Sequence, residues 1–300
     1  MTQVVGPPRP FGSLLTAMVT PMKADGSLDV DGAAKLAGYL VDEQRNDALV
    51  ISGTTGESPT TTDAEKDTLL RAVVEAVGGR AKVVAGVGTN DTRHTIELAR
   101  AAERAGVHGL LVVAPYYNRP PQAGLLRHFT AVADATGLPM LLYDIPARTG
   151  ISIETETLCR LAEHERIVGV KDAKGLPAET SWVTRRTNLA YYAGDDPMTL
   201  PLMAVGAVGL VGTSTHFTGA ETKEMIQAYD RGDVAGALAL HHKLLPMFTG
   251  VFRTQGTILV KAGLNLRGLP AGPVRSPLVD ATDEQKSQLR LDATEAGMSL

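Results

Sequence analysis

The chain has 300 residues, 44% of them hydrophobic, which is enough for a large buried core and fits the length of a single barrel domain. Its 29 basic and 33 acidic residues leave a net charge of −4 without a basic tract, so we expect no nucleic-acid partner. No run approaches the ~18 apolar residues of a membrane span, and residues 1–12 lack the apolar stretch of a signal peptide, so we expect a cytoplasmic protein.

Short apolar runs alternate with longer stretches of helical spacing over residues 1–231. The runs are nearly all apolar, as parallel strands must be when helices cover them. We predict strands at residues 13–18, 48–52, 82–86, 109–113, 140–144, 167–171, 189–193 and 209–212. We predict helices between them at residues 30–44, 62–77, 92–105, 123–136, 154–162, 179–186, 198–205 and 220–231. Eight such units favour an α/β fold of the closed (β/α)8, or TIM-barrel, type.

The strand signal stops after residue 231. Helical patterns follow at 234–249, 254–266 and 283–296, with a Gly- and Pro-rich segment at 268–277. We therefore predict two parts: residues 1–231 as the barrel that carries the active site, and residues 232–300 as a C-terminal helical extension. Thr62 and Glu65 have the spacing of a capping box at the start of the second helix.

The chain carries no motif typical of a metal or redox site. Its single cysteine, Cys159, lies in a helical pattern with no histidine placed for a catalytic dyad. The seven histidines show no H-x-H or H-E-x-x-H spacing, and the adjacent His241 and His242 point to different sides of a helix. We expect no metal and no organic cofactor.

Polar and aromatic residues gather where the predicted strands end. The chemistry of such a barrel lies at the C-terminal ends of its strands, because the βα loops converge there. Three of the seven tyrosines, Tyr116, Tyr117 and Tyr143, follow or end strands four and five, and Lys171 ends strand six. This rim is the predicted site.

Lys171 is the sharpest candidate. At the mouth of an apolar barrel, loss of solvation disfavours the ammonium form, and a neutral amine can attack a ketone to form an imine. The alternative is a structural lysine that only pairs with Asp172 or Asp196. Lys82 opens its strand at the opposite rim, where residues serve stability, and is a poor catalytic candidate.

Three further features near this rim have a functional and a structural interpretation. The turn with Thr54 and Thr55 offers N–H groups and hydroxyls to a carboxylate, although Thr/Gly turns are also common without any ligand. Tyr143 lies one strand before Lys171 and could relay protons, or could simply pack. Arg148 could bind a carboxylate through two hydrogen bonds, or could be an ordinary surface arginine.

Four segments carry a specific combined pattern: GTTGE at 53–57, YYNRP at 116–120, YDIPARTG at 143–150 and GVKDA at 169–173. Together they resemble the dihydrodipicolinate synthase family, over almost the whole of residues 12–277. The resemblance implies condensation of pyruvate with aspartate 4-semialdehyde to 4-hydroxy-tetrahydrodipicolinate, at the entry to diaminopimelate and lysine synthesis. It also implies a homotetramer and no metal or organic cofactor.

The resemblance also implies roles for single residues. Lys171 would form the imine with pyruvate. Tyr143, Thr54 and Tyr117 would relay protons, with Tyr117 reaching in from a neighbouring subunit. Thr55, together with Thr54, would hold the carboxylate of pyruvate.

The remaining positions implied by the resemblance concern the second substrate and the pocket wall. Arg148 would bind the semialdehyde. Gly194 and the carbonyl of Val211 match positions that line the pocket of the family.

One departure from the family concerns regulation. Members inhibited by lysine carry histidines at the positions of Asp63 and Lys66 and a glutamate at the position of His94. Lys66 would repel a lysine ligand, and His94 removes a carboxylate that would bind its ammonium group. We therefore predict weak or absent inhibition by lysine.

Two other functions remain open. One is another class I pyruvate-dependent aldolase on the same barrel, such as an N-acetylneuraminate lyase or a keto-deoxy sugar aldolase. These share the lysine and the tyrosine but typically lack the pair Thr54 and Thr55 followed by an arginine like Arg148. The other is a non-catalytic barrel that binds a keto acid or serves as a scaffold.

Overall fold

The structure is a computed structural model that describes residues 8–300. Eight parallel strands close into a barrel in sequential order, so β1 pairs with both β2 and β8. The strands are β1 Leu14–Ala17, β2 Ala48–Ile51, β3 Lys82–Gly86, β4 Gly109–Val113, β5 Met140–Asp144, β6 Ile167–Asp172, β7 Ala190–Ala193 and β8 Gly209–Gly212. Each predicted strand is confirmed, with its ends shifted by no more than one residue.

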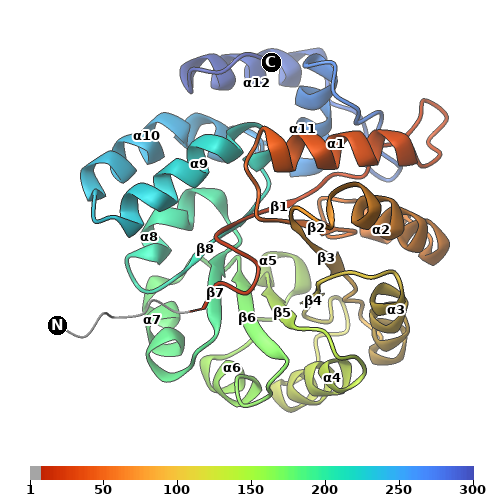
Figure 1. Ribbon diagram of the computed structural model, residues 1–300, viewed down its shortest axis with the longest axis vertical. Coiled ribbons are helices and arrows are strands. Elements are labelled where there is room, and N and C mark those ends of the chain that lie inside the picture. The colour runs from red at the N-terminus through yellow and green to blue at the C-terminus, as the bar shows by residue number, and fades with distance from the viewer. Residues whose placement is uncertain (1–7) are drawn as a thin grey trace.

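Helices ring the strands, as Figure 1 shows. Those of the barrel are α1 Val30–Asp42, α2 Asp63–Val77, α3 Thr92–Arg104, α4 Gln122–Asp134, α5 Pro146–Thr149, α6 Thr155–Leu161, α7 Pro177–Arg186, α8 Thr199–Met203 and α9 Thr215–Asp230. Three more follow: α10 Val234–Gly250, α11 Gly256–Leu266 and α12 Asp283–Glu295. The predicted capping box is present, because the Thr62 hydroxyl accepts from the Glu65 N–H while the Glu65 carboxylate accepts from the Thr62 N–H.

The strands separate two apolar layers. Side chains that point inward fill the barrel, among them Leu15, Val50 and Val211, and those that point outward pack under the helices. Phe11 closes the amino-terminal end of the barrel. A Cβ at Gly109 would lie 2.3 Å from Cζ of Phe11, so only glycine leaves space for the ring there. The packed interior leaves the opposite rim as the place for a site.

The predicted start of α9 at residue 220 is wrong, since the helix begins at Thr215. The first turn looks polar in the sequence, yet it is buried and its polar groups are paired. The Thr215 hydroxyl accepts from Thr16, and Nε2 of His216 accepts from the Val19 N–H at 3.1 Å. Tertiary hydrogen bonds therefore allow a polar sequence inside the fold. The prediction also missed the four-residue helix α5.

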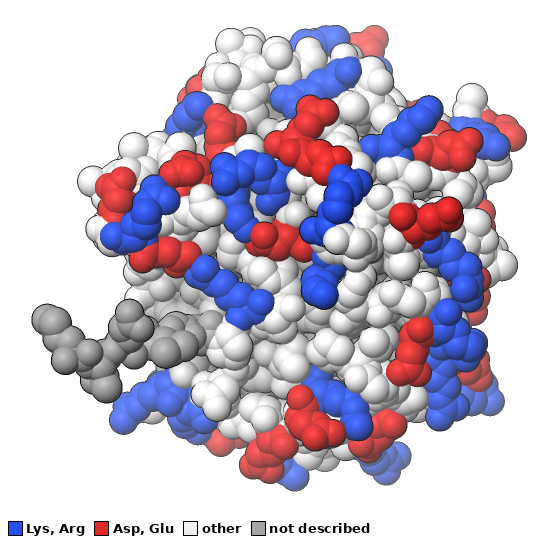
Figure 2. Space-filling view, in the orientation of Figure 1, with Lys and Arg blue, Asp and Glu red and all other residues white. Residues whose placement is uncertain are grey.

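One face of the molecule carries surface charges of both signs. Lysine, arginine and acidic side chains are intermingled over the face drawn in Figure 2. Within residues 8–300, the helices are too short or too polar to traverse a lipid bilayer.

Candidate active site

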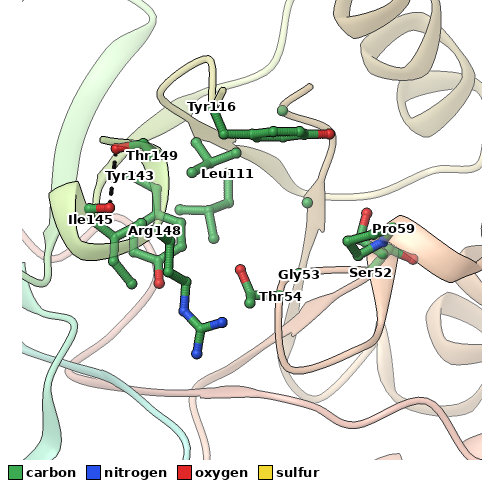
Figure 3. A pocket seen from close by; sticks show the side chains of 14 residues that line it. Ser52, Gly53, Thr54, Pro59, Leu111, Tyr116, Tyr143, Ile145, Arg148 and Thr149 are labelled. Atoms are coloured by element: carbon green, nitrogen blue, oxygen red, sulfur yellow. Dashed lines mark hydrogen bonds between the residues drawn. The ribbon is translucent and has the colours of Figure 1, made fainter. Parts of the chain in front are cut away.

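A cavity of about 380 Å³ opens where β2, β3, β4 and β5 end. Thr54, Tyr143 and Arg148 line it, together with Ser52, Gly53, Ser58, Pro59, Gly86, Gly88, Leu111, Val113, Tyr116, Ile145 and Thr149. In Figure 3 the side chains of Thr54, Tyr143 and Arg148 point into the same space. Hydroxyl, phenol and guanidinium groups at one apolar cavity suit a small anionic substrate.

Lys171 lies directly beside this cavity. It is paired with Tyr143 in the β5–β6 register, and its Nζ lies 4.4 Å from the centroid of the Tyr143 ring. The side chain does not line the cavity itself, but the Tyr143 ring does. Lys171 is 4% exposed and forms no ion pair within residues 8–300, which argues against a purely structural lysine. The Asp172 carboxylate is turned to other partners, the Tyr191 hydroxyl and the Lys174 N–H.

Burial changes the protonation of Lys171. Desolvation lowers its pKa from 10.5 to about 8; the Asp196 carboxylate opposes this shift and the Arg148 guanidinium adds to it. At a pKa of about 8, about a tenth of the amine is neutral at pH 7, compared with roughly three in ten thousand at 10.5. The site therefore supplies a nucleophilic amine at neutral pH.

Tyr143 is held in its protonated form. Burial raises the pKa of the phenol to about 12, while Arg148 and Thr54 act in the opposite direction. The hydroxyl lies at a cavity that Thr54 also lines. A protonated phenol beside a second hydroxyl can donate one proton and accept another, which is the property that a relay needs.

The missed helix α5 explains the position of Arg148. Pro146 occupies its first position, and Gly150 ends it with a φ of 77°, a left-handed conformation that glycine adopts without strain. The Gly150 N–H donates to the Pro146 carbonyl at 2.9 Å. This single turn brings the guanidinium of Arg148 back over the cavity, although the loop itself is exposed.

Asp196 is a further charged residue that influences Lys171. From the sequence we considered it only as an ion-pair partner of a structural Lys171. Its buried carboxylate accepts from the Thr213 N–H, and from the Ser214 N–H and hydroxyl at 2.8 and 2.5 Å. Burial raises its pKa to about 6, so it is largely ionised at neutral pH. The charge of this buried carboxylate raises the pKa of Lys171. Such an interaction points to a functional role, and it can be recognised only from the coordinates.

The other predicted residues, Thr55, Gly194 and Val211, do not line the cavity. A Cβ at Gly194 would lie 2.9 Å from Cγ of Lys171, so glycine leaves room for the lysine stem. Val211 is buried in β8 inside the barrel. Thr55 is buried, and its hydroxyl lies 3.4 Å from that of Thr213.

Tyr117 stands apart from the cavity. Its side chain is 89% exposed, and its φ of 72° is positive, which is strained for a tyrosine. The Asn118 N–H donates to the Tyr116 carbonyl at 2.9 Å, which closes a tight turn around Tyr117. Within one chain, therefore, Lys171, Tyr143, Thr54 and Arg148 come together and Tyr117 does not.

A protein-family comparison matches residues 10–296 to the dihydrodipicolinate synthetase family. The chain belongs to this family. The 4-hydroxy-tetrahydrodipicolinate synthase of Acidothermus cellulolyticus is 71% identical over 292 residues, which cover 97% of this chain and 94% of the relative. The 4-hydroxy-tetrahydrodipicolinate synthase 2 of Streptomyces coelicolor is 62% identical, with 98% of each chain covered. The family expected from the sequence is thus confirmed.

Solved structures of the dihydrodipicolinate synthetase family have the same fold. DHDPS from Cyanidioschyzon merolae with lysine bound superposes with a TM-score of 0.95 at 41% identity, over 97% of this chain and 100% of that one. Dihydrodipicolinate synthase from Aquifex aeolicus gives 0.93 at 34% identity, over 97% and 99%. The family membership therefore extends through the barrel and the C-terminal helices.

Among residues 8–300, no three His, Cys, Asp or Glu side chains are grouped to hold a metal ion. The polar side chains at the cavity carry hydroxyls, two phenols and a guanidinium, which are not preferred ligands for metals. The chemistry that this arrangement can perform is that of an amine and a proton relay.

Proposed function

We propose that the chain is a 4-hydroxy-tetrahydrodipicolinate synthase that condenses pyruvate with aspartate 4-semialdehyde. The observation that carries the proposal is the buried amine of Lys171, with its lowered pKa, 4.4 Å from the ring of a cavity-lining tyrosine. The relatives at 71% and 62% identity bear the name of this synthase. They favour it over a sugar-type aldolase or a non-catalytic barrel.

The chemistry starts with the neutral amine. Lys171 attacks the ketone carbon of pyruvate, the carbinolamine takes up a proton on its oxygen, and water leaves to give the imine. Loss of a proton from the methyl carbon gives an enamine, which attacks the aldehyde carbon of the second substrate, and the aldehyde oxygen is protonated. The amino group of the semialdehyde then attacks the imine carbon and displaces Lys171. Tyr143 and Thr54 move the protons in these steps.

The residues around the relay bind the two substrates. Thr55, with Thr54, holds the carboxylate of pyruvate, and Arg148 binds the carboxylate of the semialdehyde through its planar donors. Gly194 and the carbonyl of Val211 complete the pocket. Gly194 serves by leaving space for the Lys171 stem, since a Cβ there would lie 2.9 Å from Cγ.

Tyr117 joins the relay of a neighbouring subunit in a cytoplasmic homotetramer. Support comes from its exposure of 89% and from the strained turn that holds it away from the cavity of its own chain. Strain of this kind persists where it serves a function.

Lysine is a weak inhibitor or no inhibitor of this enzyme. The Lys66 ammonium is buried and donates to the Thr61 carbonyl at 2.7 Å. Asp63 lies 3.6 Å from that ammonium and 2.8 Å from Nε2 of His94. The Asp63 carboxylate is thus already engaged by two groups of the chain, and a second ammonium would meet the charge of Lys66.

Borohydride trapping tests the proposal. Reduction in the presence of pyruvate is expected to add one reduced pyruvate to Lys171, located by mass spectrometry of the peptides. Lys171→Met should abolish the adduct, while Lys82→Met, at the opposite rim, should retain it. An unlabelled Lys171 would refute the proposal.

A second assay separates the synthase from its sibling aldolases. Turnover with aspartate 4-semialdehyde is expected to exceed turnover with N-acetylmannosamine and to collapse in Arg148→Ala. Equal turnover of both aldehydes would favour the sugar-type aldolase instead.

A further inference from the structure

The C-terminal segment contacts the turn at residues 53–57, which carries Thr54 and Thr55. Glu57 ends this turn and is 3% exposed, and the side chain of Lys261 on α11 is equally hidden. Nζ of Lys261 lies 2.5 Å from Oε1 of Glu57. Residues 204 positions apart in the chain therefore form a buried ion pair directly behind the turn.

Arg275 adds a second attachment. Its N–H donates to the other carboxylate oxygen of Glu57 at 2.7 Å. Its guanidinium donates to both oxygens of Glu65 at 2.9 and 2.6 Å, and to the carbonyl of Thr60 at 2.8 Å. Arg275 thus fastens the end of the turn and the start of α2 to the segment between α11 and α12.

A third contact reaches the turn itself. The buried hydroxyl of Thr257, in the first turn of α11, donates to the Thr55 carbonyl at 3.1 Å. The Thr55 hydroxyl in turn lies 3.4 Å from that of Thr213. Both the backbone and the side chain of Thr55 are therefore held from outside the turn.

The backbone of Glu57 shows why such support is needed. Its φ of 57° and ψ of 36° lie in the left-handed region, which a residue with a Cβ adopts only at an energetic cost. The backbone hydrogen bonds of the turn include Gly56 N–H to the Gly53 carbonyl at 3.1 Å, Glu57 N–H to the Thr54 carbonyl at 3.2 Å and Ser58 N–H to the Gly53 carbonyl at 3.3 Å. Both oxygens of the Glu57 carboxylate are held, and Thr60 donates to the Glu57 carbonyl at 3.0 Å from its N–H, so side chain and backbone together support this conformation.

We infer that Lys261 and Arg275 are positioning residues, which hold Glu57 and thereby keep Thr54 and Thr55 in place for the carboxylate of the keto acid. This inference rests on the proposed function. It makes the C-terminal extension a support of the substrate site, in addition to the barrel, from which the Thr20 hydroxyl donates to the Gly56 carbonyl at 2.6 Å. The role is indirect, because neither residue lines the cavity.

The test replaces Lys261 by methionine, which keeps the stem and removes the charge. In Lys261→Met the uncompensated Glu57 is expected to leave its left-handed conformation, because an unpaired buried charge is costly. The KM for pyruvate should rise at least tenfold, because the turn no longer holds its carboxylate. The kcat should fall as well, because Thr54 also belongs to the proton relay. The pyruvate concentration for half-maximal borohydride labelling of Lys171 should rise by the same factor as KM.

Arg253→Met is the matched control. Arg253 pairs with the buried Asp292 of α12 at 2.7 Å, so this variant also breaks an ion pair within the extension, but one that does not contact the turn. It should lower the melting temperature and leave the KM for pyruvate within twofold. A purely structural role for Lys261 would give both variants the same pattern.

A double variant keeps the test decisive if Lys261→Met fails to fold. Glu57→Gln combined with Lys261→Met leaves no buried charge unpaired, yet it also loses the ion pair, so its KM for pyruvate should still rise. A folded variant with an unchanged half-saturation for labelling overturns the positioning role. Absence of any label in the unmutated protein would overturn the proposed function instead.

Discussion

Lys174 and Asp144 form a buried ion pair, with 3.1 Å between Nζ and Oδ2, directly behind the two residues proposed to carry the chemistry. Asp144 follows Tyr143 on β5, and because neighbouring residues of a strand face opposite sides, it points outward from the barrel. Lys174 comes three residues after Lys171 and also contacts the carboxylate of Glu179 at 3.1 Å. The pair thus joins the ends of β5 and β6, where the imine would form.

The protonation of this pair follows from its burial. Burial raises the pKa of Asp144 to about 6, against the opposing effect of Lys174. Burial lowers the pKa of Lys174, but the carboxylates of Asp144 and Asp172 outweigh it and raise the pKa above its ordinary value. Both members are therefore charged at neutral pH, and neither is replaceable alone.

Lys174→Met is expected to destabilise the protein by up to about 3–5 kcal/mol, because the buried Asp144 carboxyl loses its counter-charge and must stay unpaired or take up a proton. Equilibrium unfolding in urea measures this loss. The control is Arg71→Met, which breaks an exposed pair with Asp67 on one helix and should change the free energy of unfolding far less. Equal losses in the two variants would contradict a special role for the buried pair.

The strands and the amine were predictable from the sequence because both depend on local pattern. Buried parallel strands produce apolar runs, and Lys171 stands out at the end of one. The start of α9 was not predictable, since His216 and Thr215 are satisfied by Val19 and Thr16 from a distant strand and loop. The polarity of a short sequence segment does not indicate hydrogen-bond partners that lie about 200 residues away in the chain.

The same limit applies to the site. Thr54, Tyr143 and Arg148 were recognisable because they end strands or follow them closely, where βα loops meet. The contribution of Asp196 depends on hydrogen bonds from Thr213 and Ser214, and that of Lys261 on a contact with a turn at the other end of the chain. Such tertiary contacts have no signature in the order of residues.

Tyr143→Phe is expected to lower kcat by about 10²–10⁴-fold, because the relay loses its protonated phenol. The KM for pyruvate should change little, since Thr54 and Thr55 remain. Steady-state kinetics with both substrates measures the two constants. Tyr192→Phe is the control, as its buried hydroxyl donates to the Gly12 carbonyl at the far end of the barrel; an equal loss of kcat there would argue against a specific role for Tyr143.

Inhibition by lysine tests the cluster of Asp63, Lys66 and His94. Micromolar lysine is expected to leave the rate unchanged, because the buried Lys66 ammonium repels a second one. The triple variant Asp63→His, Lys66→His, His94→Glu, which restores the pattern of inhibited relatives, should gain sensitivity. Strong inhibition of the unmutated enzyme by micromolar lysine would refute the prediction.

The rate of imine formation is expected to follow the ionisation of Lys171. Since the neutral amine attacks, and burial lowers its pKa to about 8, the rate of borohydride-trapped labelling should rise with pH and level off above about 8. Two variants shift this inflection in opposite directions. Arg148→Met removes a positive charge that lowers the pKa of Lys171, so the inflection should move to higher pH.

Asp196→Asn removes a negative charge that raises the same pKa, and the amide keeps a hydrogen-bond acceptor for the Thr213 and Ser214 N–H groups. The inflection should therefore move to lower pH, and labelling at pH 6 should become faster than in the unmutated protein. Labelling at fixed pyruvate from about pH 5 to about 12 measures all three profiles. An inflection near the ordinary lysine value of 10.5 in the unmutated protein would show that the amine is solvated, and the proposed mechanism would then lose its nucleophile.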